Sequence, residues 1–317
     1  MKRVVFVAIM LALAVSVSLR PSAARTPAQT GTELLNALPD GNAVVLIDVQ
    51  RVTSSALWNM LAAQEKFRSA FDKIQSSLAE VGLSLSDVQT VAVSFSNADA
   101  NNPAVAVSGR LNQSALLARL RADEKVKLTS ETYKGFEVFK VEPVKAPAGK
   151  PHDSGGFAFL DGTTAVAGTN ASVRAAIDVK TGSRASIAQN AKLTEALATT
   201  NGAAVRFALE MSTLAGKLPT GPMGDFSSIK LIFGSVDVTT AIDLNATLRN
   251  DTAEHAHALA TQLSGLLEMA RGFLGASKDP KMAPLAAALK SVSITGNEQD
   301  VRITGSLPME VLAQLLH

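Results

Sequence analysis

The 317-residue sequence contains no cysteine, one tryptophan, one tyrosine and four histidines. The lack of cysteine excludes disulfides, thiolate chemistry, cysteine-ligated zinc and a lipid-modified cysteine near the N-terminus. Aromatic residues make up 4% of the chain and none is interleaved with basic residues, so stacking on sugars or on single-stranded nucleic acid is poorly supported. We therefore expect noncovalent packing to stabilise the protein.

Charge is also scarce. Charged residues make up 18% and apolar residues 47% of the chain, against about 25% charged residues in an average globular protein. This composition predicts a packed globular protein and argues against disorder. The formal net charge is +2, but Lys2, Arg3 and Arg20 lie in a stretch without acidic residues. The rest of the chain has 27 basic and 28 acidic residues, a net charge of −1. A nucleic-acid partner is not expected without a basic face or stripe.

The first 24 residues have the pattern of a secretory signal peptide. A positive start is followed by the uncharged, mostly apolar run Val4 to Leu19, and Ser22-Ala23-Ala24 supplies the small residues that signal peptidase requires. The apolar run is shorter than the roughly 20 residues of a membrane span. We expect cleavage between Ala24 and Arg25 and export to the periplasm or the outside. An uncleaved membrane anchor is the alternative.

The alternation and spacing of apolar residues predict an α+β fold of antiparallel sheets with helices packed on one face. The expected organisation is a signal peptide (1–24), a polar lead with a short helix (25–40), a first α+β module (41–210), a glycine- and proline-rich loop or boundary (211–228) and a second α+β module (229–317).

One order of elements recurs along the chain. Two strands, a helix and two strands are predicted from Val91 to Val141 and again from Ile229 to Leu307, with residues 107–112 and 245–250 at matching places before each helix. We infer two related ββαββ modules that arose by a diverged duplication.

Polar residues in front of helical patterns predict the helix N-termini. The expected caps are Thr53 or Ser54, Asn112, Asn170, Asn190 and a capping box of Asp251 and Glu254. Gly82, Gly182 and Gly275 are expected to end helices.

Apolar stripes mark the helices expected to cover the core. One helix carries Phe67, Phe71, Ile74, Leu78 and Val81 at spacings of four and three, and the longest helix carries Leu263, Leu266 and Phe273. We expect these stripes to be core. If a helix is not fully covered, the same stripe becomes a groove for a lipid or another protein.

Residues that could carry chemistry are few, and we expect no catalytic, cofactor or metal site. His255 and His257 next to Glu254 resemble a metal cluster, but residues two apart on a helix point to nearly opposite sides. His152 and His317 have no local partner. Neither the G-x-S-x-G elbow nor a phosphate-binding glycine loop occurs.

Two polar features remain. Asp48 interrupts an apolar strand, and we interpret it as a carboxylate that bonds neighbouring backbone at a strand end. The stretch Gly168 to Ser172 joins a strand to a helix, where free amides with Arg174 nearby could hold an anion, although an ordinary Asn170 cap explains it better.

Several short segments carry a family resemblance. Tyr133-Lys134-Gly135, Phe157 to Gly162, Ala165 to Gly168, Val173 to Asp178 and Ser186 to Asn190 resemble a family of uncharacterised exported bacterial proteins, known as a domain of unknown function. The opening Leu38-Pro39-Asp40-Gly41 before a strand that ends at Asp48 is similar as well. The resemblance covers residues 38–211 and implies no activity.

We therefore predict an exported, non-catalytic module that binds a partner protein or envelope component, without metal or cofactor. A carrier of an apolar ligand such as a lipid, held between sheet and helices, is the alternative, and a hydrolase comes third. The loops Glu142 to Gly156 and Met211 to Ser228 are the expected binding loops. The sequence leaves the oligomeric state open.

Overall fold

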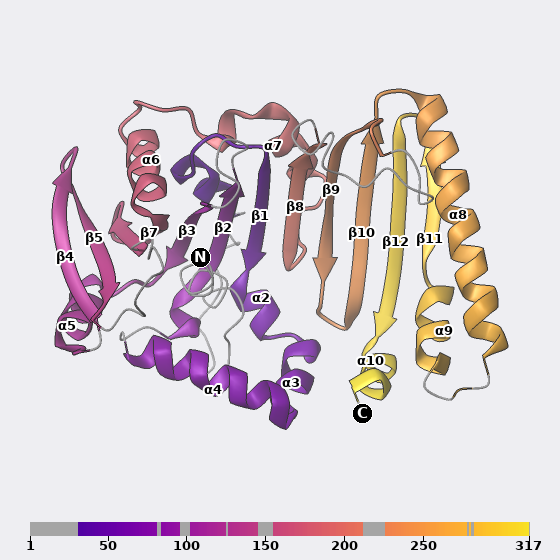
Figure 1. The fold of residues 1–317 in the computed structure, drawn as a ribbon, viewed down its shortest axis with the longest axis horizontal. Helices are drawn as coiled ribbons and strands as arrows, with labels where there is room; N and C mark the ends of the chain where they lie inside the picture. Colours follow the sequence, from indigo (N-terminus) through magenta and orange to yellow (C-terminus); the bar gives the residue numbers. More distant parts are fainter. Residues whose placement is uncertain are drawn as a thin grey trace. The chain divides into compact units, whose positions relative to one another are not determined.

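The structure is a computed structural model that describes residues 31–80, 84–95, 102–124, 126–144, 155–211, 226–277, 279 and 282–316 (Figure 1). The expected signal peptide with its cleavage site at Ala24 and Arg25, His152 and His317 lie outside the described residues, as do most of the two loops expected to bind. Helices pack with large antiparallel sheets, which confirms an α+β fold.

Contacts divide the chain into two compact units. The first unit comprises residues up to Thr53 and Leu61–Thr194, and the second comprises Ser54–Met60 and Glu195–His317. The contacts thus separate at Glu195, before a strand that the sequence analysis assigned to the first module.

In the first unit the strands lie side by side in the order β1-β2-β3-β7-β6-β5-β4, and all neighbours are antiparallel. Their bounds are β1 Ala43–Asp48, β2 Val88–Phe95, β3 Ala104–Gly109, β4 Val126–Tyr133, β5 Phe136–Pro143, β6 Gly155–Phe159 and β7 Thr164–Thr169. The helices are η1 Gly31–Ala37, α2 Val49–Thr53, α4 Glu65–Glu80, η2 Leu85–Asp87, α5 Gln113–Ala122, α6 Asn170–Lys180 and η4 Ile187–Gln189. Two helices, α3 Ala56–Ala63 and α7 Ala191–Ala198, contain residues of both units.

A row of small and branched apolar residues runs straight across this sheet. The strand registers place its members opposite one another, and each is at most 1% exposed; they are Leu46, Ala92, Ala106, Val166, Ala158 and Val138. Helix α6 lies on this face, since a side chain at Gly156 would meet Val173 of α6. The helix presents Ala176 and Ile177, both fully buried. The row is therefore fully buried.

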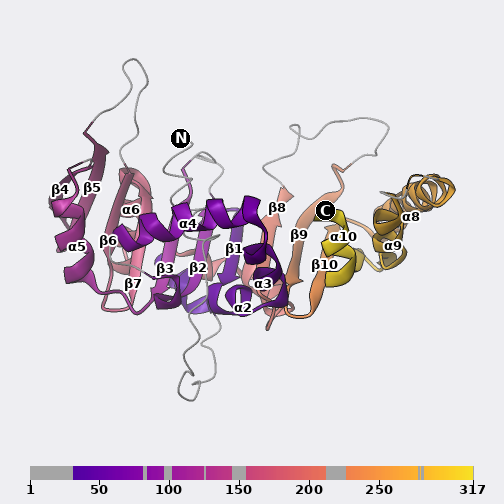
Figure 2. The same cartoon turned by 90° about the horizontal axis from the view of Figure 1, so that it is seen from below.

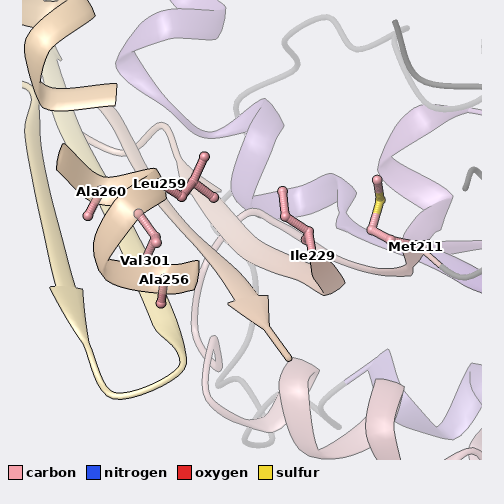
Figure 3. Close-up of a cluster of buried hydrophobic side chains, with 6 residues drawn as sticks. All are labelled: Met211, Ile229, Ala256, Leu259, Ala260 and Val301. Atoms are coloured by element: carbon pink, nitrogen blue, oxygen red, sulfur yellow. The ribbon is translucent and has the colours of Figure 1, made fainter. Parts of the chain in front are cut away.

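The second unit is a smaller sheet with the strand order β8-β9-β10-β12-β11. Its elements are β8 Val205–Glu210, β9 Ile229–Asp237, β10 Ala241–Asn250, α8 Ala253–Ala276, α9 Ala283–Lys290, β11 Ser293–Asn297, β12 Asp300–Pro308 and α10 Met309–Leu316. Part of its core is a cluster at the start of α8, made of Met211, Ile229, Ala256, Leu259, Ala260 and Val301 (Figure 3). Gly296 of β11 lets α8 approach, because a side chain there would meet Ala260.

Two strands, helix and two strands follow one another in both predicted stretches, with the additional helix α9 in the second, but their sheets differ. In the second unit β10 pairs directly with β12. In the first unit the hairpin β6–β7 lies between the corresponding strands β3 and β5. Both outer hairpins turn on two residues, of which the first, Lys134 or Glu298, has a positive φ. The duplication stays a prediction.

The helix caps were predicted in part. Asn112 and Asn190 accept hydrogen bonds from the amides of Ala115 and Leu193. Gly182, with φ 74°, follows α6 as expected. Three caps were wrong by one or two residues: the true caps are Ser55, Thr169 and Thr252, which accept from Trp58, Ser172 and His255. Helix α8 also continues through Gly275 to Ala276.

The stripe on α4 is core in part. Phe71 is buried and Phe67 is 38% exposed, with their ring centroids 6.5 Å apart. The side chains of Ile74 and Leu78, and Val81 and Gly82, lie outside the described part of the chain.

Candidate binding surface

The second unit exposes apolar side chains on one face of its sheet. On β10, Leu244 and Ala246 alternate with Asp243 and Asn245, and the registers place apolar residues of β9 and β12 on the side of Leu244. We call this surface the open face and define it by residues that are all half-buried except Leu244, which is 39% exposed. They are Val205, Phe207, Val236, Ile242, Leu244, Ala246, Ile303 and Leu307.

Helix α8 borders the open face. Its first half packs on the same side of the sheet through Ala256, Leu259 and Ala260. In its second half no described residue is fully buried, and Met269 and Phe273 are 65% and 77% exposed. The predicted core assignment of Phe273 was therefore wrong: its stripe extends beyond what the sheet covers.

Arg271 fixes the neighbouring helix α9 against α8, and the two helices lie side by side in both views (Figures 1 and 2). Its guanidinium donates to the carbonyl oxygens of Leu289, Lys290 and Val292 at and after the end of α9. These carbonyls are the acceptors that a helix C-terminus leaves unpaired. These hydrogen bonds thus join α8 to α9. The residues of the open face nevertheless remain half-buried.

The opposite face is polar on β10 and β12, whereas on β8 and β9 it carries the buried side chains of Ala208 and Phe233. The Arg249 guanidinium donates two hydrogen bonds, of 2.8 and 2.9 Å, to the carboxylate of Asp300 directly across the ladder. The hydrogen bond to Asp300 raises the pKa of Arg249, and its guanidinium lies 5.3 Å from the centroid of the Phe233 ring. The strands β10 and β12 of the second unit thus have one polar face and one apolar face.

A second candidate is a charged network in the first unit, where the buried row ends at the edge strand β4. Glu131 accepts hydrogen bonds from Arg174 of α6 at 2.6 Å and from Lys140 of β5 at 3.1 Å. The hydrogen bond from Arg174 is the main cause that lowers the pKa of Glu131, followed by that from Lys140. Arg174 also lies 4.8 Å from the centroid of the Tyr133 ring.

The same network continues to Asp178, which accepts from Lys134 and, at 3.0 Å, from the Tyr133 hydroxyl. The hydrogen bond from Lys134 is the main cause that lowers the pKa of Asp178. Both carboxylates are therefore held ionised and paired, which does not suit a general acid. We interpret the network as the attachment of α6 to the β4–β5 hairpin.

Most residues singled out in the sequence have structural roles. Asp48 accepts a hydrogen bond from the backbone amide of Arg51 at 2.9 Å, which confirms the predicted strand-end carboxylate. The His255 ring nitrogen Nδ1 lies 2.6 Å from Asp251, and this hydrogen bond is the main cause that lowers the pKa of Asp251. His257 is exposed. Among the described residues no three histidines or acids are grouped as metal ligands would be.

The cap predicted in the stretch Gly168 to Ser172 was wrong by one residue. Thr169 caps α6 in place of Asn170, because the chain turns helical one residue earlier than predicted. Arg174 extends to Glu131. Two buried atoms here, Asn170 Oδ1 and Arg174 Nε, have no hydrogen-bond partner among the described residues.

Local sequence patterns revealed neither the open face nor the charged network. Alternation in β10 signalled an apolar face, but nothing in the pattern said whether helices would cover it. Glu131 and Arg174 lie 43 residues apart, so no local spacing could reveal their pairing.

Comparison with known proteins informs the fold alone. No protein-family model and no curated protein matches the sequence. The chain is similar to crystal form III of TP0453, with a TM-score of 0.52 and 11% identity over 89% of this chain and 96% of that chain. Crystal form IV of TP0453 gives a TM-score of 0.49 and 10% identity over 89% of this chain and 95% of that one. No helix among the described residues has the length and apolarity that a membrane crossing requires.

Proposed function

We propose that the protein is an exported, non-catalytic module that binds a partner protein or envelope component through the open face. The observation that supports this proposal is the half-buried apolar surface centred on Leu244. Contiguous apolar surface that stays accessible on a soluble protein is typical of interaction sites.

Shape and composition favour a macromolecular partner. The open face spreads over β8, β9, β10 and β12, a broad sheet surface, and Met269 and Phe273 stand exposed on the adjacent helix. Methionine and aromatic side chains are enriched at protein interfaces, where they give a large contact area. The network around Glu131 does not favour an enzyme, because its carboxylates are paired with cations.

A carrier of an apolar ligand such as a lipid is the second candidate. One observation favours it: the open face lies on the side of the sheet that α8 covers, so an apolar chain could lie between sheet and helix. Apolar lining with few polar groups is typical of such sites.

Site-specific photocrosslinking in the producing cell tests the proposal. A p-benzoylphenylalanine residue is placed at Leu244, on the open face, or at Asn245, the next residue on the opposite, polar face. We expect one saturable protein adduct from position 244 and none from position 245. The matched control distinguishes a specific binding site from nonspecific crosslinking, because the two positions share a strand and differ in the face they occupy.

Mass analysis distinguishes the candidates. A protein adduct from position 244 supports the partner proposal, and an adduct with the mass of a lipid supports the carrier. Equal labelling from both positions, or none from position 244 in a folded protein, contradicts the open face as a binding site.

A further inference from the structure

Strand β4 is the outermost strand of the first unit's sheet (Figure 1). It pairs with β5 over its whole length without a bulge, and the two-residue turn Lys134–Gly135 closes the hairpin. Such a turn follows a hydrogen-bonded pair, Tyr133 with Phe136, and hydrogen-bonded and non-hydrogen-bonded pairs then alternate along the ladder. The non-hydrogen-bonded pairs include Val126 with Pro143, which has no amide hydrogen.

This alternation determines which backbone groups of β4 point away from β5. They belong to Val126, Leu128, Ser130 and Thr132. The Val126 amide donates to Asp123, in agreement with an outward direction. The amides and carbonyls of Leu128, Ser130 and Thr132 have no partner among the described residues. Six aligned backbone groups therefore form an open edge.

The edge has few of the devices that usually protect one. β4 contains no proline and no bulge, and its one lysine, Lys127, lies near its start. The outer strand of the second unit differs: β11 has five residues, and α8 packs against its Gly296. An unprotected edge of this length is a template for another strand.

We propose that a second copy of this chain pairs antiparallel with β4, with Ser130 opposite Ser130 of the partner copy. The three outward residues are symmetric about Ser130, so a two-fold axis there satisfies all six groups of both strands. Leu128 then lies opposite Thr132 of the other copy. The sheets of the two copies become one.

Charge supports a second copy as the occupant. On the face that carries Glu131, this register sets Lys127 opposite Tyr133 and diagonal to Glu131 of the other copy, and sets Glu131 opposite Thr129. Cross-strand and diagonal neighbours interact, and like charges directly opposite would be unfavourable. No like charges face each other in this register, and opposite charges meet twice.

The absence of cysteine from the chain permits a clean test. In a hydrogen-bonded pair the Cα atoms lie about 5.5 Å apart, within the range of a disulfide. A single cysteine in Ser130→Cys should therefore form a disulfide-linked dimer under mild oxidation. The matched control is Thr132→Cys, an exposed residue on the same edge and face, which meets Leu128 and not itself.

Sedimentation velocity supplies a second measurement without oxidation. The purified protein should dimerise weakly, since one strand pair buries less than a stable interface requires. Ser130→Pro removes an outward amide and leaves the β5 ladder intact, so it should weaken dimerisation at least about tenfold. Ser130→Ala should not. The circular dichroism spectra of both variants should match the unmodified protein.

Crosslinking of Ser130→Cys at least about tenfold faster than Thr132→Cys, at equal thiol exposure, supports the register; the factor reflects the steep distance dependence of disulfide formation. Equal rates, no crosslinking of Ser130→Cys, or dimers unaffected by Ser130→Pro overturn the proposal. Pairing of an extended peptide with β4 in a chain that is monomeric without the peptide also overturns it. The open face plays no part in these outcomes.

Discussion

The two units cover their sheets differently. In the first, the row from Leu46 to Val138 is buried along its whole length, with α6 packed on part of it, and ends in the charges around Glu131. In the second, the corresponding row passes through Phe207, Ala246 and Ile303, all half-buried, and only the first half of α8 packs closely. Apolar alternation thus predicts which face a helix can cover. The stripe of a helix does not predict how much of that helix packs, since the stripe of α8 continues to the exposed Phe273.

The largest expected effect contrasts the two units directly. Ile177→Ala removes a fully buried side chain in the first unit and should lower the free energy of unfolding by about 2–5 kcal/mol, through lost transfer energy and the cavity left behind. Leu244→Ala on the open face should cost less than about 1 kcal/mol, because that side chain already contacts solvent. Urea titrations monitored by circular dichroism measure both.

Equal costs for these two substitutions would mean that the open face is covered in solution. Phe207→Leu extends the comparison to the middle of the second row and should also stay within about 1.5 kcal/mol.

These contrasts bear on what the sequence could predict. The caps Asn112 and Asn190 and the role of Asp48 depend on neighbouring residues and were predicted. The position of β6–β7 between β3 and β5 depends on pairing across long separations, which no local pattern specifies. Coverage of the open face was unpredictable for the same reason.

A smaller effect is expected from the attachment of α9 to α8. Arg271→Met keeps the length of the side chain and removes its hydrogen bonds to the carbonyls of Leu289, Lys290 and Val292. We expect a loss of about 1–3 kcal/mol, as for charged donors to carbonyls. Glu268→Gln is the control, because it removes only the exposed ion pair with Arg271 and should cost less than about 1 kcal/mol.

Thermal unfolding followed by circular dichroism measures this effect. If Arg271→Met were as mild as Glu268→Gln, the helices of the second unit would be held by apolar contacts alone.

A further prediction for the first unit concerns the residue that caps the N-terminus of α6. Thr169→Ala should destabilise the protein by about 0.5–2 kcal/mol, because the Ser172 amide loses its acceptor. Asn170→Ala should be nearly neutral or stabilising, since its buried Oδ1 accepts no hydrogen bond from the described residues. A larger loss of unfolding free energy for Asn170→Ala than for Thr169→Ala would mean that Asn170 caps α6, as expected from the sequence. Denaturant midpoints decide between them.

The smallest effect concerns the charges at the end of the buried row. Arg174 and Lys140 lower the pKa of Glu131 below its ordinary value of 4.5. A carboxyl with a lowered pKa in the folded state stabilises the protein above its unfolded pKa, and this contribution is lost as the pH falls through the folded pKa. The difference in unfolding free energy between the protein and Glu131→Gln should therefore be full at neutral pH and shrink below about pH 4.5. It should be small and should weaken with salt, because the groups are partly exposed. Glu137→Gln, at an exposed residue of β5 without an ion pair among the described residues, is the matched control. A difference that persisted unchanged at acid pH would show that Glu131 holds α6 by packing and not by its charge. The edge of the first unit would then be stabilised by packing, as the buried row is.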